Sequence, residues 1–421
     1  MTDALQRSYR SPSQEVALPS SLAAYRPPDP TAPVNSQSIL EALAATVIPA
    51  SLMTLSGGAF AGKQASTPSG DGYYGPNAVV RDWTMQVRGC PTLFTATQIG
   101  DFCDMIASIA GSDGVNEGLN ASGGEIAWGG GGGSDRSMLP IDNQFEFVDM
   151  VYSHFLKTGS ATKFTELEST LLAAYNATHH FTVQNHLVFI DPDTFGGHVV
   201  EWGFWDSWDV RGYASMTSVM RYRATVQIAE MLTALGRTSD AAPYTAEAAA
   251  IKAAIGTYLY DSASGLLKFG TLGGNQQKSP IASAYAVVCG AVDDTISDAI
   301  STALYNRLPG GSLVSDGCFL HGQVRDTCFT DHDLAGGGPS MDGSYQAGGY
   351  WAVATGWAAQ AIKRLFPSAA NTFMDSWASE TQRQASGAPY EYATLGGGSG
   401  SHQYGASAAL PLQYFSSTFN R

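Results

Sequence analysis

The chain has 421 residues, 44% of them apolar, so it is long enough to bury a substantial core. Its formal net charge of −15 argues against nucleic acid or an anionic membrane as a partner, because both require a basic face. No apolar run reaches the roughly 18 residues that cross a bilayer, and residues 1–33 lack the apolar core of a signal peptide. We therefore expect a cytoplasmic protein, or a secreted one if a leader has been removed.

Apolar residues recur at helical spacing along most of the chain beyond a polar, Pro-rich segment, 1–35, which we expect to form a surface arm. The first helix should open at Ser36 or Ser38, which are suited to capping it. Further helices are expected near 95–111, 142–158, 160–177, 209–235, 240–259, 280–290, 292–306, 347–365, 368–385 and 404–416. No sustained alternation of Val, Ile and Thr appears, so any sheets should be small hairpins within the connections.

Long loops rich in Gly and aromatic residues separate the expected helices about once per helical hairpin. They cover residues 56–83, 112–141, 190–208, 309–346 and 386–404. A ring of helical hairpins would gather such loops at one rim, around a central cleft. We therefore predict an all-α fold in which residues 36–421 form one (α/α)6 barrel, with an irregular α bundle as the alternative.

The loop around residues 198–213 combines indole rings with carboxylates. It contains Trp202, Trp205, Trp208, Glu201, Asp206 and Asp209, followed by Arg211. Indole faces stack on the apolar faces of sugar rings, and carboxylates accept hydrogen bonds from hydroxyl groups or transfer protons. Indoles also desolvate a nearby carboxyl group, which raises its pKa and suits it to general acid catalysis. The alternative is a helix start capped by Ser207 or Asp209, with the indoles packed in the core.

The order of several motifs over about residues 70–415 resembles that of the six-hairpin glycosidases, and within them the trehalases and related inverting enzymes. Arg81-Asp82-Trp83 stands where trehalases carry a Trp-Asp-Ser-Tyr-type motif. The stretch from Glu201 to Arg211 is similar to their Glu-Ser-Gly-Trp-Asp-Phe-Ser-Ser-Arg motif, whose Asp is the general acid.

Three later stretches continue the resemblance. Residues 258–265, Tyr-Leu-Tyr-Asp-Ser-Ala-Ser-Gly, look like the family's Leu-Trp-Asp-x-x-x-Gly turn. Residues 345–351, Tyr-Gln-Ala-Gly-Gly-Tyr-Trp, are similar to its Trp-Asp-Tyr-Pro-Asn-Gly-Trp loop. Glu391 lies between two tyrosines ahead of a glycine run, which resembles the Glu-Lys-Tyr motif that supplies the general base.

The resemblance implies an inverting glycosidase of small glycosides or oligosaccharide ends, with Asp206 as general acid and Glu391 as general base. Glycoside hydrolysis requires such a pair of carboxyl groups, one protonated and one ionised. The residues agree, because Asp206 lies among indoles while Glu391 lies beside flexible glycines where it can stay ionised. Glu117, Glu125 and Glu146 are rival bases, and Glu146 is also suited to pairing with an Arg in the core.

We expect the remaining candidates to bind sugar by ring stacking or by hydrogen bonds to hydroxyl groups. They are Tyr74, Arg81, Asp82, Trp83, Trp128, Asp142, Asn143, Gln144, Trp202, Trp205, Arg211, Tyr345, Gln346, Trp351, His402 and Tyr404. At least three of Trp83, Trp128, Trp202, Trp205 and Trp351 should line one cleft. Asp82 and Trp83 are equally suited to capping and packing a helix, and Asp142 to serving as an N-cap.

Neither a metal nor a cofactor is expected. The histidines lack ligand spacing with a carboxylate, and only Asp331-His332-Asp333 invites a cation, with a solvated loop as the alternative. No phosphate or dinucleotide fingerprint follows a strand. Two other function classes stay open: a sugar isomerase or epimerase using His321 and His402, and a carbohydrate-binding protein without turnover.

Overall fold

A computed structural model describes most of the chain beyond the expected N-terminal arm. The described residues are 35–126, 139–178, 181–191, 204, 210–272, 277–308, 319–325, 345–346, 348–384, 389–394 and 397–416. Over these ranges the chain is mostly helical, with small antiparallel sheets in the connections, which confirms that part of the prediction. None of the helices in these ranges is both long enough and apolar enough to span a membrane.

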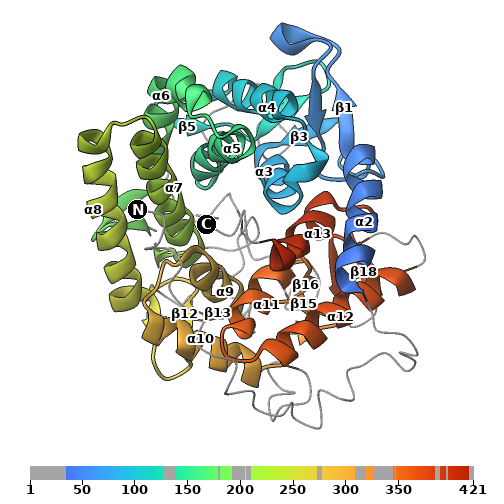
Figure 1. The fold of residues 1–421 in the computed structure, drawn as a ribbon, viewed down its shortest axis with the longest axis vertical. Helices are drawn as coiled ribbons and strands as arrows, with labels where there is room; N and C mark the ends of the chain where they lie inside the picture. The colour runs from blue at the N-terminus through green and yellow to red at the C-terminus, as the bar shows by residue number, and fades with distance from the viewer. Residues whose placement is uncertain are drawn as a thin grey trace.

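An inner layer of six helices lies around the centre of the described molecule (Figure 1). Its members are α3 (Val80–Gly89), α5 (Asn143–Thr158), α7 (Ser215–Ala234), α9 (Pro280–Cys289), α11 (Thr355–Lys363) and α13 (Gly405–Ala409). Each packs on the next from α3 to α11, and the 3-10 segment η7 (Leu410–Phe415) continues α13. The circuit closes because η7 contacts α11, while both η7 and α13 contact α3.

The outer helices alternate with the inner ones along the chain and lie outside them in Figure 1. They are α2 (Ser36–Ser51), α4 (Ala96–Ser108), α6 (Thr162–Tyr175), α8 (Thr238–Ala254), α10 (Asp294–Asn306) and α12 (Pro367–Arg383). Helix α2 packs on α12 and α13, so helices from opposite ends of the described chain lie side by side.

Several helix ends follow from local capping chemistry. Thr95 begins α4 with a capping box, in which its hydroxyl accepts the Gln98 N–H at 3.1 Å and Gln98 bonds back to the Thr95 N–H. Helix α5 ends at Gly159, whose φ of 68° places it in the left-handed region that favours glycine. The expected cap of the first helix is corrected, because Asn35, not Ser36 or Ser38, accepts the Ser38 N–H at 3.1 Å.

Helix α3 was not predicted, because residues up to 83 were assigned to a loop. A helical signal was nevertheless present, because Val80, Trp83 and Val87 recur at i, i+3 and i+7 and give the helix an apolar face. Its polar side chains Asp82 and Arg88 are buried as well. Helices α7 and α11 also begin later than expected, because an extended segment precedes each of them.

The strands lie in the connections between helices. They are β1 (Leu52–Thr54), β2 (Gln64–Ser66), β3 (Asn77–Val79), β4 (Ala110–Gly111), β5 (Gly114–Val115), β6 (Gly118–Asn120), β7 (Glu125–Ile126), β8 (Thr182–Gln184), β9 (Leu187–Ile190), β10 (Gly212–Tyr213), β11 (Tyr260–Asp261), β12 (Leu266–Lys268), β13 (Lys278–Ser279), β14 (Phe319–Leu320), β15 (Gln323–Val324), β16 (Tyr350–Trp351), β17 (Tyr392–Thr394) and β18 (Gly397–Ser399). Five of the six sheets have two or three strands, as the prediction of small hairpins requires.

One sheet is larger than the sequence suggested. Strands β14 to β18 pair in chain order as a five-stranded antiparallel sheet, which joins the two late loops that were expected to be separate. Trp351 pairs with Tyr392 across β16 and β17. The sheet therefore holds Trp351 close to the segment that carries Glu391.

Candidate active site

A pocket with about 400 Å³ of empty space lies at the N-terminal ends of the inner helices. Its lining comprises Arg81, Met85, Phe204, Ile281, Tyr345, Gln346, Trp351, Val353 and Tyr404. Of these, Arg81, Ile281, Val353 and Tyr404 each stand within two residues of the start of α3, α9, α11 or α13. Helix N-termini carry partial positive charge, so the pocket favours a ligand rich in oxygen acceptors or a developing negative charge.

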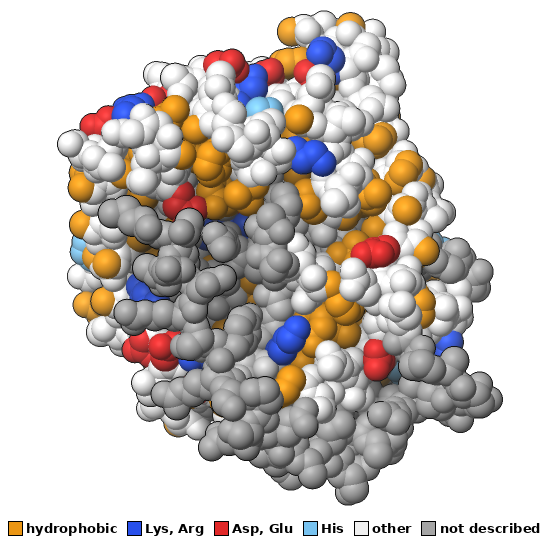
Figure 2. Space-filling model, viewed as in Figure 1, with side chains coloured by type: hydrophobic (Ala, Val, Ile, Leu, Met, Phe, Trp, Pro, Cys, Tyr) orange, Lys and Arg blue, Asp and Glu red, His pale blue; other side chains and the backbone are white. Residues whose placement is uncertain are grey.

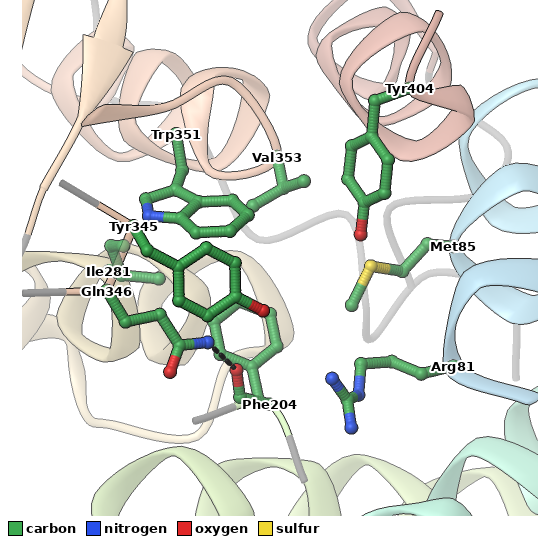
Figure 3. Close-up of a pocket in the computed structure, with 9 residues that line it drawn as sticks. All are labelled: Arg81, Met85, Phe204, Ile281, Tyr345, Gln346, Trp351, Val353 and Tyr404. Atoms are coloured by element: carbon green, nitrogen blue, oxygen red, sulfur yellow. Dashed lines mark hydrogen bonds between the residues drawn. The ribbon is translucent and has the colours of Figure 1, made fainter. Parts of the chain in front are cut away.

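One wall of the pocket is aromatic, and it faces Tyr404, Met85 and Arg81 across the gap (Figure 3). The Trp351 ring stacks on Tyr392 with centroids 5.5 Å apart, and Tyr345 meets Trp351 edge-on at 5.2 Å. Tyr345 has a φ of 41°, and its carbonyl accepts the Gly349 N–H at 2.7 Å. Gln346 donates to the Phe204 carbonyl at 3.0 Å. These contacts fix aromatic faces of the kind that stack on sugars.

The opposite wall carries charge. The Arg81 Nε lies 3.0 Å from Asp142 Oδ2 in a pair whose carboxylate is fully buried. Asp82 hydrogen-bonds the Tyr404 hydroxyl, and burial, followed by the charges of Asp82 and Glu391, raises the pKa of Tyr404 well above its usual value. The phenol therefore keeps its proton, and its O–H group donates a hydrogen bond to Asp82. Arg81, Asp82, Asp142 and Tyr404, four of the residues predicted to bind sugar, thus lie together in the structure.

Glu391 lies directly ahead of β17 and is only 2% exposed. The Tyr74 hydroxyl donates to its Oε1, and the Ser401 N–H donates to its Oε2 at 3.2 Å. Burial, followed by the charges of Tyr404 and Glu391, raises the pKa of Tyr74 far above its usual value, so Tyr74 stays a donor. Two donors on one carboxyl group favour the ionised form, which is the form that a general base requires.

Gly400 lets the backbone approach this carboxylate. Its φ of 71° is in the left-handed region, and a Cβ placed there would lie 2.3 Å from Glu391 Oε2. The Glu391 N–H also donates to the Ser401 carbonyl at 2.9 Å, so the same two residues are bonded twice. Glycine at this position therefore allows the loop to wrap tightly around the carboxylate.

Some predicted binding residues lie elsewhere. Trp83 is fully buried and stacks on Phe102 at 5.6 Å, so it has no exposed face for a sugar and packs α3 against α4. The amide groups of Asn143 and Gln144 are buried and donate to main-chain carbonyls of the connections, Asn116 at 2.8 Å and Ala177 at 3.1 Å.

The last two described candidates do not line the pocket. The His402 ring packs edge-on against Tyr390 with centroids 4.7 Å apart, and the residue is exposed. The Arg211 carbonyl accepts the N–H groups of Thr271 and Leu272 at 3.0 and 3.2 Å, which ties its backbone to the next connection. Trp128, Trp202, Trp205 and Asp206 lie outside the described residues.

The rival bases are distributed over other parts of the molecule. Glu125 accepts the Asn116 amide at 2.8 Å within the β6–β7 connection, and Glu117 is buried directly ahead of β6. Glu146 lies in the core, where the charges of Arg88 and Arg223 act on it. Among these three rivals and Glu391, only Glu391 accepts a hydrogen bond from Tyr74. Tyr74 in turn interacts with Tyr345 and Tyr404, which line the pocket.

The histidines proposed for isomerase chemistry are also apart from the pocket. His321 has its Nδ1 3.9 Å from Glu380 and is partly exposed, and neither it nor His402 is among the lining residues. The described geometry therefore gives no support to a reaction that uses this pair.

Sequence reasoning missed several residues of the site. Met85, Ile281 and Val353 line the pocket but look like any core residue, so no signal was present to find them. Asp71 and Ser401 flank recognised residues, and the Asp71-Gly72 turn signal directly ahead of Tyr74 was available but unused.

The sequence matches no known family model and no curated protein. Its fold is similar to solved glycosidases. A glycosidase with a single Glu-to-Ala substitution, in complex with glucose, has 13% identity and a TM-score of 0.63 over 91% of this chain and 98% of that one. A metal-independent α-mannosidase from Streptococcus pneumoniae, with α-1,6-mannobiose, has 12% identity and a TM-score of 0.56 over 92% and 94%.

A third neighbour is larger than this protein. A rhamnosidase from Klebsiella oxytoca with rhamnose bound has 13% identity and a TM-score of 0.55 over 80% of this chain, which spans 57% of that enzyme. At these identities the similarity shows a glycosidase-type helical fold. The narrower resemblance to trehalases depends on the sequence motifs alone.

Proposed function

We propose that the protein is a glycoside hydrolase and that its closed helix circuit is the inner ring of an (α/α)6 barrel. The observation that carries the proposal is a buried carboxylate, Glu391, held by a tyrosine and a main-chain N–H beside a pocket with an aromatic wall. The glycosidase-type fold supports the same assignment, and the alternation of inner and outer helices supports the barrel.

In the proposed reaction, Glu391 activates a water molecule and Asp206 protonates the leaving oxygen, with inversion at the anomeric carbon. The support for the base is its pair of donors, because they favour a carboxylate at neutral pH. Each carboxylate oxygen has a second lone pair, so a water can still be held. The support for Asp206 is its place in the motif order and its neighbouring indoles.

The proposed substrate is a small, neutral glycoside. The space between the pocket walls is small, and the 400 Å³ that it encloses includes the opening to solvent. Stacking on Trp351 and Tyr345, with hydrogen bonds from Arg81 and Tyr404, would suit a sugar ring. The motif order further suggests trehalase-like specificity, so trehalose belongs among the substrates to be tested.

The experiment is a panel of 4-nitrophenyl glycosides and disaccharides, with products followed by mass spectrometry and proton NMR. Hydrolysis by the unaltered chain and its loss in Asp206→Asn and Glu391→Gln are expected. An activated aryl leaving group needs little protonation, so it should rescue the Asp206 variant much more than the Glu391 variant. Retained anomeric configuration in the first product would show that Glu391 does not activate water.

A further inference from the structure

A short turn ahead of α3 supplies one of the two donors to Glu391. Residues 71–75 reverse the chain, with glycines in the left-handed region at Gly72 and Gly75, and the Gly75 N–H donates to the Gly72 carbonyl at 2.9 Å. Tyr74 belongs to this turn. The other donor, Ser401, lies 330 residues from Asp71 in the sequence.

Asp71 connects these two segments. Its carboxylate accepts the His402 N–H at 2.7 Å, the Ser401 hydroxyl at 3.2 Å and the Tyr73 N–H at 3.0 Å. The first two bonds attach it to the loop that follows Glu391, and the third fixes its own turn. One side chain therefore bonds both the turn that carries Tyr74 and the segment that carries Ser401.

Main-chain bonds extend the same junction. The Gly70 N–H donates to the Gln403 carbonyl at 3.0 Å, and the Gly405 N–H donates to the Pro68 carbonyl at 2.8 Å. These bonds bring the two strands of chain together but do not fix the turn at 71–75, because they lie on its N-terminal side. Apart from the bond of Tyr74 itself to Glu391, the bonds of Asp71 are those across the junction that lie nearest to Tyr74 along the chain.

We propose that Asp71 is a positioning residue that holds the Tyr74 hydroxyl and the Ser401 N–H on Glu391. This inference rests on the proposed function, in which Glu391 is the general base. Without the Asp71 carboxylate, the turn and the Glu391 loop separate, and both donors move relative to the carboxylate that they stabilise. Misplacement of donors by a fraction of a hydrogen-bond length weakens such preorganisation.

The charges around this junction are consistent with an ionised Asp71. Burial works to raise the pKa of Asp71, but hydrogen bonds from the His402 and Tyr73 N–H groups outweigh it and keep the pKa below its usual value. Tyr74 and Tyr404 are the titratable groups that interact with Glu391, and Asp82 and Tyr345 in turn interact with Tyr404. Asp71 is connected to Glu391 through Ser401. The raised pKa values keep Tyr74 and Tyr404 protonated, so a change of the activity profile at acidic pH reports on the carboxylates.

The test compares Asp71→Asn and Asp71→Glu with the unaltered chain, using the fastest 4-nitrophenyl glycoside of the panel. The amide keeps the shape of the side chain but replaces one acceptor with a donor that faces N–H and O–H groups. We expect kcat to fall about 10-fold and KM to stay nearly unchanged. The fall is smaller than the roughly 10²- to 10⁴-fold rate enhancement of general acid–base catalysis, because Glu391 itself is kept. The acid limb of kcat/KM should move to higher pH, and Asp71→Glu should restore part of the loss.

The matched control is Asp293→Asn. Asp293 is also an exposed aspartate that accepts a main-chain N–H, that of Ile296 at 2.8 Å, but it caps α10 outside the site. Its variant should keep the unaltered kcat and pH profile. A double variant, Asp71→Asn with Tyr74→Phe, should lose less activity than the product of the two single losses, because both act on Glu391.

The outcomes separate the two proposals. Full activity in Glu391→Gln would contradict the proposed function. An inactive Glu391→Gln together with unchanged kcat and pH profile in Asp71→Asn, or with independent losses in the double variant, would overturn the positioning role alone. If Asp71→Asn does not fold, Ser401→Ala removes one bond to Asp71 while keeping the N–H on Glu391. That variant should show a smaller loss with the same pH shift, and an unchanged profile would overturn the proposal.

Discussion

Glu391 and Glu146 are both buried, at 2% and 1% exposure, yet their surroundings differ in kind. Glu391 has two hydrogen-bond donors on its carboxylate, one from a tyrosine and one from the main chain. Within the described structure, neither carboxylate oxygen of Glu146 has a hydrogen-bond partner, although both are buried. Equal burial therefore does not lead to equal protonation.

Glu146 belongs to a charged cluster inside the helix circuit. Asp149, one turn further along α5, takes the strong contacts: Arg88 at 2.9 Å, Arg223 at 2.9 Å and the Gln227 amide at 2.6 Å. Burial raises the pKa of Glu146 to about 8, against the opposing charge of Arg88. Burial also works to raise the pKa of Asp149, but Arg223 and Arg88 outweigh it and the pKa falls below its usual value.

The comparison shows that the supply of donors, not the depth of burial, decides which carboxyl group keeps a negative charge. In the core, Arg88 and Arg223 pair with Asp149, and burial raises the pKa of Glu146 to about 8, so Glu146 is mostly a neutral acid near pH 7. Beside the pocket, the Tyr74 hydroxyl and the Ser401 N–H stabilise the negative charge of Glu391 by hydrogen bonds, and neither group carries a positive charge. The hydrogen bonds described for Glu391 therefore come from uncharged groups, whereas those of Asp149 include two arginines.

The largest effect is expected from Glu391→Gln. The amide cannot accept a proton, so kcat should fall by roughly 10²- to 10⁴-fold, while the shape of the side chain is kept. The Tm should change little. Steady-state kinetics on the unaltered chain and the variant measure the loss, with Glu125→Gln as the control at a distant glutamate. Activity within twofold of the unaltered chain would remove Glu391 from catalysis.

The next largest effect should come from Asp149→Asn, on stability. Removing this carboxylate leaves Arg88 and Arg223 buried without their main partner, which typically costs about 3–5 kcal/mol. Urea denaturation followed by circular dichroism measures the free energy of unfolding. A loss below about 1 kcal/mol would mean that the cluster is held together by something other than this carboxylate.

Tyr74→Phe should have an intermediate effect on catalysis. The ring is kept, but Glu391 loses a donor whose bond to a charged group is worth about 1.5–3 kcal/mol. The acid limb of kcat/KM should therefore move up by about one to two pH units. If the acid limb of the kcat/KM profile stays at the same pH, Tyr74 does not determine the charge of Glu391.

The effect of Glu146→Gln should be visible in the pH dependence of stability. Its pKa is about 8 in the folded chain, above the ordinary value of 4.5, so the folded state holds a proton that the unfolded state has lost. Stability is therefore lost as pH rises from about 4.5 to about 8, by at most about 1.4 kcal/mol per pH unit. Glutamine does not titrate, so the variant should show a shallower slope in urea titrations at pH 5–8. Identical slopes would contradict the raised pKa.

The helices were largely predictable, because their caps and apolar spacing are local. Thr95 with Gln98, and Gly159 after α5, mark helix ends by chemistry within a few residues. Helix α3 was missed although Val80, Trp83 and Val87 show helical spacing, because it is only ten residues long and follows a Gly-rich loop. The burial of its polar side chains was not predictable, because it depends on partners far along the chain, such as Asp149 for Arg88.

The site was predictable only in part for the same reason. Glu391 and Tyr404 carry recognisable motifs, and the structure places both near Tyr74. Trp83 carries an equally good motif but is buried in the core, since a tryptophan that stacks on sugar and one that packs on Phe102 look alike in sequence. The Asp71-Gly72 pair marked a turn, but the role of Asp71 was not predictable, because its partners at Ser401 and His402 are main-chain and hydroxyl groups that any sequence contains.

The packing of α2 on α12 and α13 has a consequence for synthesis of the chain. The Tyr74 hydroxyl and Glu391 are 317 positions apart, and Ser36 bonds Asp375 over a separation of 339. Such contacts raise the contact order and slow folding, because a long loop must close before they form. During synthesis, α2 and the Tyr74 turn are made before α12, α13 and the Glu391 segment, with which they form these contacts. A nascent chain thus acquires its closed circuit and the donors on Glu391 in one late step.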